Sequence, residues 1–497
     1  MAFHFSKSKY CRLWQCPKMV WLDKFRAEEA VEDPDRVARM QTGNRVGELA
    51  KGLFGDYVDM TVETATGLDL SAMMEKTKEA MDAGAEVICE AAFSYDGLYC
   101  AVDILRKEKD GYAIYEVKSS TVAKPVYSVD IAYQKFVLEH CGVRVTGTYL
   151  VCMNNTYYRD ETLDIQQLFK VINVSRSVAK ETPNVENRLA EAKKLLADDT
   201  EPNYDLGSHC GKPYVCAYWQ YCSRNLPKPS VADLAVSLGS AMKLYDQGAV
   251  TLEDTVKLNL PLKASQERMV RHNLADLPDE IHKAGIQDFL DSLTYPLYFL
   301  DFESMQQAIP EYPNEKSYDQ IVFQYSLHYM QTPGGELKHT EFLAESGPDP
   351  RRAVAESLCR DIPTEGSILA YHDGFEGQRL EELARVFPDL ADQLLRMAGN
   401  LVDLEDPFKK GYYYTKAMGC SSSIKKVLPA LFPNDPELDY HSLEDVHNGS
   451  EAMQIFPKLK DMPPEEAARI RKNLLAYCKL DTLAMVKILE KLQEVVK

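Results

Sequence analysis

The sequence predicts a protein of the mixed α/β and α+β classes with two main domains. In the first half, apolar strands are separated by tight turns, and in the second half apolar strands alternate with helices. The length of 497 residues supports two or three domains. We place domains at 1–225 and 291–497, joined by short helices at 226–290 that open on the proline-rich stretch LPKPS.

Composition and charge limit the classes of function. The formal net charge of −19 argues against a passive coat for nucleic acid, because such proteins carry basic surfaces. It is compatible with a nuclease, since bound metal ions supply positive charge in a cleft. No apolar run is long enough to cross a bilayer, and the N-terminus lacks the apolar core of a signal peptide. We therefore expect a cytoplasmic protein with no membrane partner.

The first domain is expected to run from two helices into a β-hairpin, then a helix, a strand and a cysteine-rich tail. The hairpin region reads VICEAAFS, LYCAVDILRKE and YAIYEVKSS, with the turns YDG and KDG between the strands. Asp103 lies on the middle strand, and Glu116 and Lys118 project from one face of the next. Two carboxylates can hold a divalent ion, while a lysine can stabilise negative charge or orient a water molecule.

This D-(x)n-E-x-K grouping resembles the PD-(D/E)XK nuclease core, which has a restriction-endonuclease-like fold. The resemblance implies that Asp103 and Glu116 bind Mg²⁺ or Mn²⁺ and that Lys118 is catalytic. Glu48 in NRVGELAKGLF would sit on a helix and complete the acidic set. Gln134 in DIAYQKFVL matches the glutamine on the helix after the core in RecB-like members. The alternative interpretation is an exposed hairpin with a surface Glu–Lys pair.

Twelve cysteines in a cytoplasmic protein favour metal ligation or buried thiols over disulfides. Cys210, Cys216 and Cys222 form a C-x5-C-x5-C pattern, and Cys16 lies in WQCPKMVWL near the other end of the domain. Four thiolates suit structural zinc or an iron–sulfur cluster, and zinc knuckles usually use closer C-x2-C pairs. Cys11 competes with Cys16, although the Cys-Pro-Lys context favours Cys16. The other cysteines are predicted as core residues: Cys89, Cys100, Cys141, Cys152, Cys359, Cys420 and Cys478.

One cysteine before the core and three after it is the arrangement of the RecB-like iron–sulfur nucleases. These include the CRISPR-associated Cas-four type nucleases and the AddB nuclease domain. The resemblance implies a [4Fe–4S] cluster that holds the two ends of the domain together. The sequence departs from the CRISPR-associated pattern in its first motif, where Gly47-Glu48 stands in place of a histidine. Buried thiols near a surface loop are the alternative interpretation.

The second domain begins with the apolar strands YPLYFLDFE, IVFQYSLHYM and LKHTEFLAE, followed by helices and strands up to a final helix over roughly 465–495. Three antiparallel strands followed by α/β alternation suit an RNase H-like sheet. Asp301 and Glu303 project from one face of the first strand. Tyr477 and Asp481 lie at i and i+4, on one face of the last helix. Carboxylates at the ends of apolar strands cost free energy to desolvate unless a cation or hydrogen bond compensates.

A D-x-E strand paired with a tyrosine four residues before an aspartate resembles the DnaQ-like (DEDD) 3′–5′ exonucleases of the tyrosine subtype. The resemblance implies four carboxylates that hold two metal ions, and a tyrosine that positions the attacking water. The fourth acid is expected from SILAYHDGFEGQRLEELA, where alignment on Phe375 makes Glu376 the ligand and Asp373 its competitor. Asp403 in NLVDLEDPF is a further candidate for a supporting carboxylate.

Residues 291–497 also resemble the bacterial family called domain of unknown function 2779. The stretches that carry this resemblance are YPLYFLDFES, IVFQYSLHYM, GCSSSIKKVLPALFP and LLAYCKLDTLAMV. That family often has a RecB-like iron–sulfur nuclease ahead of it, as here. Lys425 and Lys426 in SSIKKVLPAL are candidates for phosphate contacts, and a solvated helix face is the alternative.

Together these patterns predict a metal-dependent DNA exonuclease with two nuclease domains, acting in repair or in defence against foreign DNA. The expected substrate is single-stranded DNA or a frayed DNA end. Since no G-x-x-x-x-G-K-[ST] loop is present, a helicase or another repair or defence protein is the expected partner for unwinding. Two alternatives stay open: a nucleic-acid-binding module in which one or both domains are inactive, and an exonuclease that acts on RNA.

Overall fold

The computed structural model describes residues 4–31, 33, 35–65, 67–363, 365–440, 443 and 445–497. The chain forms two compact units. Unit 1 contains Met1–Lys228, Ser237–Val250 and Gln307–Tyr318. Unit 2 contains Pro229–Val236, Thr251–Gln306 and Asp319–Lys497. The chain therefore leaves each unit and re-enters it.

Unit 1 is built on a mixed sheet whose centre is the predicted hairpin region. The strands β5 (Val87–Tyr95), β6 (Leu98–Glu108) and β7 (Gly111–Lys118) are antiparallel neighbours, which confirms the prediction for this segment. Asp96 and Gly97, between β5 and β6, both have positive φ, as the commonest two-residue hairpin turn requires.

Further strands extend this sheet on both sides. The strand β8 (Val145–Met153) pairs parallel to β7 and antiparallel to β9 (Phe169–Asn173). The short strands β1 (Phe5–Ser6) and β2 (Val58–Asp59) pair parallel to β6 and β5. Strands β1, β2 and β9 were not predicted, and the two residues of β1 and of β2 are too few for an alternating pattern.

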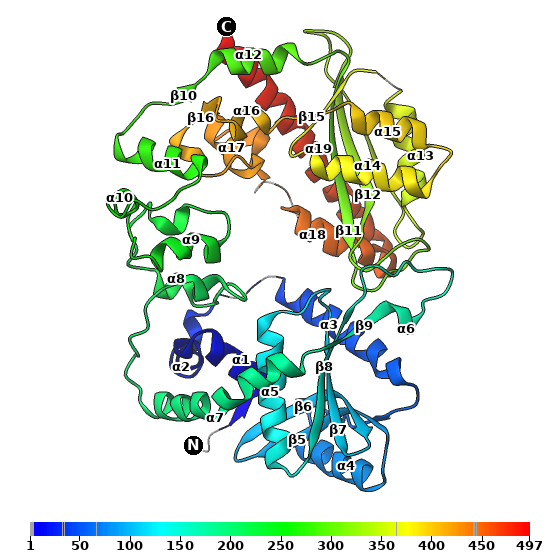
Figure 1. The fold of residues 1–497 in the computed structure, drawn as a ribbon. Coiled ribbons are helices and arrows are strands. Elements are labelled where there is room, and N and C mark those ends of the chain that lie inside the picture. Colours follow the sequence, from blue (N-terminus) through cyan, green and yellow to red (C-terminus); the bar gives the residue numbers. More distant parts are fainter. Residues whose placement is uncertain are drawn as a thin grey trace. The chain divides into compact units, whose positions relative to one another are not determined.

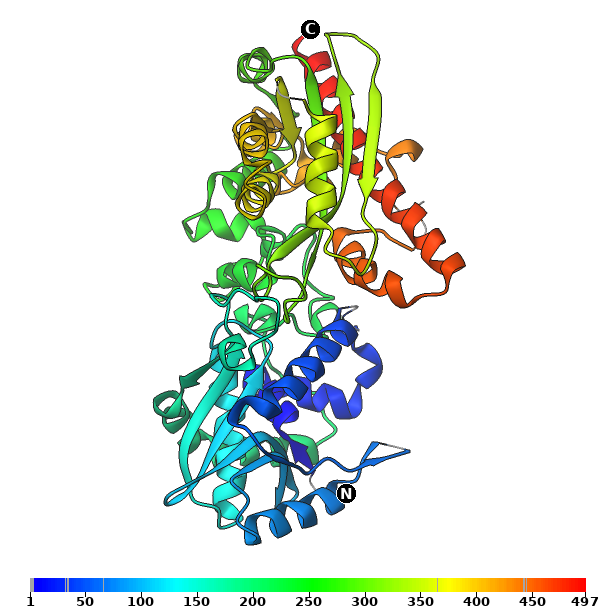
Figure 2. The ribbon, with the colours of Figure 1, turned by 90° about the vertical axis from the view of Figure 1, so that its right-hand side faces the viewer.

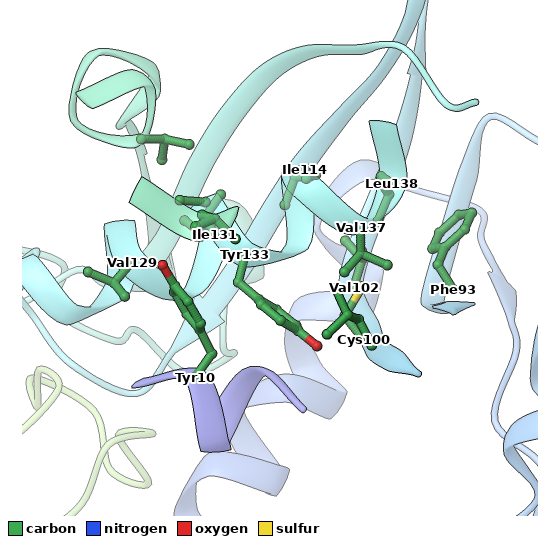
Figure 3. Packing of buried hydrophobic residues seen from close by; sticks show 14 of the residues in the cluster. Tyr10, Phe93, Cys100, Val102, Ile114, Val129, Ile131, Tyr133, Val137 and Leu138 are labelled. Atoms are coloured by element: carbon green, nitrogen blue, oxygen red, sulfur yellow. The ribbon is translucent and has the colours of Figure 1, made fainter. Parts of the chain in front are cut away.

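Helices cover both faces of the unit 1 sheet. The helix α5 (Pro125–His140) begins with proline at its first position and buries most of its residues against one face. The helices α1 (Lys7–Gln15) and α7 (Ser175–Ala197) pack on α5. Figure 3 shows Tyr10 of α1 next to Tyr133 of α5 within this core. The helix α3 (Arg36–Ala50) contributes to a second core on the other face.

The smaller elements of unit 1 surround this framework. Its remaining helices are α2 (Pro17–Phe25), α4 (Leu70–Asp82), α6 (Ile165–Leu168), α8 (Trp219–Cys222) and α9 (Leu238–Tyr245). The strands β3 (Glu63–Thr64) and β4 (Gly67–Leu68) form a separate pair. The 23-residue helix α7 was not predicted, and Pro183 interrupts its sequence pattern.

Unit 2 is built on a five-stranded sheet in the order β13-β12-β11-β14-β15. The strands β11 (Leu297–Gln306), β12 (Gln320–Met330) and β13 (Lys338–Leu343) are antiparallel. The strand β14 (Ser367–Ala370) pairs parallel to β11, and β15 (Leu401–Asp403) pairs parallel to β14. Helical connections lead into both, as parallel pairing requires. The predicted three antiparallel strands and the α/β alternation after them are confirmed.

Residues of β11 alternate between two hydrophobic cores. Leu297 and Phe299 pack in a core with the long helix α19 (Pro464–Val496). Tyr298, Leu300 and Phe302 pack instead with the helices α13 (Arg351–Asp361), α14 (Gly374–Val386) and α15 (Ala391–Gly399). Figures 1 and 2 show the central strands between α19, in red, and these yellow helices. By the same alternation, Asp301 and Glu303 lie on the side of the sheet that α19 covers.

The other elements of unit 2 are helices and two very short strands. The helices on the second face of the sheet are α13 (Arg351–Asp361), α14 (Gly374–Val386) and α15 (Ala391–Gly399). The rest are α10 (Leu252–Lys257), α11 (Ala264–Leu274), α12 (Lys283–Asp291), α16 (Asp406–Lys409), α17 (Ile424–Leu431) and α18 (Gly449–Ile455), with the antiparallel pair β10 (Glu280–Ile281) and β16 (Tyr413–Tyr414). No helix in the described part of the chain is long and apolar enough to span a membrane.

Candidate functional site

A cluster of carboxylates in unit 2 joins three elements that lie far apart in the sequence. Asp301 and Glu303 project from β11, Glu376 from the first turn of α14, and Asp481 from α19. The negative charges of Glu303, Glu376 and Asp481 all raise the pKa of Asp301. Glu303 and Glu376 are buried, whereas Asp301 and Asp481 are partly exposed. The structure thus brings the four predicted carboxylates together.

Burial raises the pKa of every carboxyl group in this cluster. For Asp301 and Glu303, repulsion from Asp481 adds to the effect of burial. Burial raises the pKa of Glu376 to about 8, and its Oε2 has no hydrogen-bond partner among the described residues. Hydrogen bonds to Asp481 partly oppose the increase in its pKa that burial causes. This concentration of negative charge is unfavourable unless a cation neutralises it.

Two tyrosines contact the carboxylate of Asp481. Tyr440 donates its phenolic hydrogen to Asp481 Oδ1 at 2.6 Å, and Tyr477 forms a second hydrogen bond to the same residue. The contact of Tyr477 follows from its position one turn before Asp481 on α19. Tyr440 was not predicted, because it lies in an irregular segment that packing alone brings to α19.

Cys478 was predicted as a core residue, and the structure confirms that it is buried. It is fully buried, but its Sγ lies 3.4 Å from Asp301 Oδ2. Ligand atoms of Cys478, Asp301 and Glu303 all lie within 4.8 Å of one another. The i, i+3 spacing of Cys478 and Asp481 on α19 is the sequence signal that could have identified it.

A cavity of about 640 Å³ adjoins this cluster, with Asp481 and Tyr440 in its wall. Most of the other lining residues are apolar and come from α17 and the segment after it: Ile424, Leu428, Pro429, Phe432, Pro436 and Leu438. Lys425 also lines the cavity, and its positive charge opposes the increase in the pKa of Glu303 and Asp481. Lys426 is exposed and does not line it. The volume is that of a typical small-molecule site.

The alternative acids Asp373 and Asp403 belong to a neighbouring group. Asp403 Oδ1 accepts hydrogen bonds from the backbone N–H groups of His372 and Glu405, each at 2.9 Å. Burial raises the pKa of Asp373, and repulsion from Asp403 adds to it. The negative charge of Glu376, unlike that of Asp373, raises the pKa values of both Asp301 and Glu303. The structure therefore places Glu376 with the predicted ligands.

Unit 1 contains a second carboxylate group, in which lysines accompany the acids. Glu116 is fully buried and lies 2.5 Å from Lys118 Nζ. Lys118 also contacts Asp130 Oδ2 at 2.9 Å. Gln134 of α5 donates to Glu116 Oε2 at 2.7 Å, and Asp103 Oδ2 accepts from the backbone N–H of the residue after Glu116 at 2.7 Å. The predicted Asp103, Glu116, Lys118 and Gln134 thus lie together.

Three further residues of this group were not predicted. Lys7, at the start of α1, contacts Glu116 at 3.1 Å and Asp103 at 3.4 Å. Asp130 lies one turn before Gln134 on α5, a spacing visible in the sequence. Glu90 of β5 lies opposite Asp103 of β6, because the residues before and after Glu90 pair with the residues after and before Asp103. Burial, with added repulsion from Asp103, raises the pKa of Glu90 to about 7.

The structure does not place Glu48 in this group. Its side chain is 67% exposed and lies 2.7 Å from Lys51 Nζ. Lys51 also pairs with Asp59 at 2.7 Å. Val46 and Ala50 of α3 are fully buried, so Glu48, halfway between them in the sequence, points away from the core. Glu90 and Asp130 are the carboxylates that instead accompany Asp103 and Glu116.

The four predicted cysteine ligands surround one small cavity in unit 1, which is lined by Cys16, Cys210, Cys216 and Cys222. Cys16 caps the C-terminus of α1, and the other three follow α7 in the chain. Burial raises the pKa of each thiol. No three of the sulfur atoms lie within 4.8 Å of one another. Thiolates around tetrahedral zinc would be about 3.8 Å apart.

The remaining cysteines only partly follow the core prediction. Cys11 lies near Asp130 and Lys118 instead of the cysteine cavity, so the structure groups Cys16 with the other three ligands. Cys89, Cys100 and Cys152 are buried as predicted, whereas Cys359 and Cys420 are half-buried and Cys141 is exposed. Cys141 follows the last residue of α5, where the helix leaves the core.

Comparison with known proteins finds one family match, which lies mostly in unit 2. Residues 298–423 match the family described as Domain of unknown function (DUF2779), which confirms that resemblance over these residues. The match includes Asp301, Glu303 and Glu376 and ends before Tyr477 and Asp481. No curated protein and no solved structure matches the chain.

Proposed function

We propose that this protein is a metal-dependent DNA exonuclease with two nuclease units, acting in repair or in defence against foreign DNA. The observation that carries the proposal is the unit 2 cluster of Asp301, Glu303, Glu376 and Asp481 beside a cavity of nucleotide size. Carboxylates that repel one another in a partly buried site are stabilised by divalent cations.

The arrangement of strands supports a nuclease fold for each unit. In unit 2, three antiparallel strands are followed by two strands reached through helices, as expected for an RNase H-like, DnaQ-like sheet. In unit 1, the strands β5 to β7 are followed by α5 and the parallel strand β8, and Glu116 and Lys118 are on β7. This order supports a restriction-endonuclease-like PD-(D/E)XK core of the RecB-like kind.

The oxygen-rich ligands of unit 2 suit Mg²⁺ or Mn²⁺, which Asp301, Glu303, Glu376 and Asp481 would hold. Such ions supply an activated water and stabilise the negative charge that develops at phosphorus. Tyr477 would orient the attacking water from its position next to Asp481. Lys425 contributes positive charge to the cavity wall, where it would contact a phosphate group.

In unit 1, Asp103 and Glu116 would hold a divalent ion. Asp130 holds Lys118 with its ammonium group next to Glu116, where it can stabilise negative charge. Gln134 fixes the carboxylate of Glu116 through Oε2. The thiols of Cys16, Cys210, Cys216 and Cys222 would hold a [4Fe–4S] cluster, since all four line one cavity and no three of their sulfur atoms are as close as zinc requires.

Cleavage assays on end-labelled strands test this function. The full chain, purified without oxygen, is incubated with single-stranded DNA, duplex DNA and a matched RNA in Mg²⁺ or Mn²⁺. We expect cleavage of DNA that a chelator abolishes, partial loss in Glu116→Ala and in Asp301→Ala, and complete loss in the double variant. Glu48→Ala, which changes an exposed acid outside both groups, serves as the control. A double variant that cuts as fast as wild type would refute the proposal.

A further inference from the structure

The side chain of Lys7 reaches the unit 1 carboxylates from the N-terminal end of α1. Its Nζ lies 3.1 and 3.3 Å from the two oxygens of Glu116 and 3.4 Å from Asp103 Oδ1. These are the two residues that would hold a divalent ion between β6 and β7. The ammonium group therefore lies where a cation shared by Asp103 and Glu116 would lie.

The two lysines of the site differ in their other contacts. Lys118 has a second partner in Asp130, at 2.9 Å, which can retain its ammonium group when the oxygens of Glu116 bind an ion. Among the described residues, the ammonium group of Lys7 contacts Asp103 and Glu116, which are themselves the predicted ligands. An ion bound by these two carboxylates would therefore occupy the oxygen atoms that the ammonium group of Lys7 contacts.

We propose that Lys7 competes with the divalent ion for Asp103 and Glu116, so that metal binding in unit 1 requires the Lys7 side chain to move out. An ammonium group and a divalent ion within about 3 Å of the same oxygens repel each other strongly. Lys7 would thus set the metal concentration at which unit 1 becomes active. The inference rests on the proposed function of this site.

Helix α1 fixes the backbone of Lys7, so that the competition involves its side chain alone. Tyr10 is fully buried and stacks on Tyr133 of α5, with ring centroids 5.1 Å apart (Figure 3). At the other end of α1, Gln15 Nε2 donates to the carbonyl oxygens of His209 at 2.9 Å and Tyr214 at 2.8 Å. The Lys7 side chain is 25% exposed, and its four-carbon stem is flexible.

Mn²⁺ binding by the full chain, measured by titration calorimetry, tests the competition. Asp301→Asn and Asp481→Asn together provide a background in which the unit 2 site is weakened. In this background, Lys7→Met removes the charge at similar size and should tighten Mn²⁺ binding by about tenfold or more. Lys7→Arg keeps the charge and should bind no more tightly than the background. Adding Glu116→Gln should remove the binding, which assigns it to unit 1.

Two negative results have different meanings. If the background binds Mn²⁺ through Glu116 and Lys7→Met binds it equally or more weakly, the competition is overturned while the metal site stands. If no variant shows binding that depends on Glu116, the metal site of unit 1 is overturned together with the inference. If Lys7→Met fails to fold, Lys7→Gln provides the same test. Mn²⁺ should raise the melting temperature of either variant more than that of the background.

Discussion

Glu116 and Glu376 are both buried glutamates, but their pKa values shift in opposite directions. Burial and Asp103 oppose the ionisation of Glu116, yet Lys118 and Lys7 outweigh them and lower its pKa. Burial raises the pKa of Glu376 to about 8, and the unpaired Oε2 has no compensating donor among the described residues. At neutral pH the metal-free chain therefore holds one glutamate ionised and the other mainly protonated, because of their neighbours alone.

The raised pKa of Glu376 makes the stability of the metal-free chain depend on pH. The unfolded chain releases this proton near pH 4.5, whereas the folded chain keeps it up to about pH 8. The contribution to stability is thus complete below pH 4.5 and decreases by about 1.4 kcal/mol per pH unit towards pH 8. Glu376→Gln should weaken this dependence, as measured by urea denaturation in chelator between pH 5 and 8.

Glu381→Gln changes an exposed glutamate of the same helix, α14, and is the matched control. Its free energy of unfolding should depend on pH in the same way as that of wild type. If the free energy of unfolding changed equally with pH in wild type and in Glu376→Gln, the assignment of a buried, protonated Glu376 would be contradicted.

The hydroxyl group of Tyr477 should contribute to the chemical step in unit 2. Tyr477→Phe removes the group that contacts Asp481 but keeps the packing of the ring beside Tyr440. We expect kcat to decrease about 10²-fold with little change in KM. The measurement uses a Glu116→Ala background and an end-labelled single strand. Tyr329→Phe, on β12 and in contact with the opposite core, is the control and should not change kcat.

At the scale of elements, helix α1 joins the two candidate centres of unit 1. Lys7 is its first residue and contacts the carboxylates, while Cys16 caps its other end and lines the cysteine cavity. Cys16 and Cys222 pack with Trp21 of α2 and with Tyr218, so residues from both ends of the unit share one apolar cluster. A cluster bound by the four thiols would strengthen that connection.

The cysteine cavity leads to a prediction about iron. We expect the chain purified without oxygen to contain iron and to absorb visible light, and Cys216→Ser to lose both. Its melting temperature should also decrease, because the bound group stabilises the folded state. Cys141→Ser changes an exposed thiol outside the cavity and should retain the iron. A colourless wild type that contains zinc would contradict the iron–sulfur assignment.

At the scale of the whole molecule, each unit has its own hydrophobic cores. We expect calorimetry to resolve two unfolding transitions, since separate cores support separate cooperative units. Ile131→Ala in unit 1 and Leu489→Ala in unit 2 should each lower a different transition, at a cost of about 2–5 kcal/mol. A single transition that both substitutions lower equally would show that the chain unfolds as one unit.

Local patterns made the elements and part of the sites predictable. The apolar runs of β5 to β7 and the turns between them are properties of neighbouring residues, as is the i, i+4 spacing of Tyr477 and Asp481. Glu116 and Lys118 share a face of β7 for the same reason. Contacts such as Tyr440 with Asp481 and Lys7 with Glu116 could not be predicted, because they join segments without a common periodicity.

The sequence by itself therefore determined the order of the central strands of each sheet, and which acids and cysteines belong to each half of the chain. The tertiary structure alone decided between competing residues. It placed Glu376 and Cys16 with the predicted ligands and left Asp373, Cys11 and Glu48 outside. The physical reason is that local periodicity determines the face of a helix or strand on which a side chain lies. Long-range packing determines which charged groups and thiols from other elements contact that side chain.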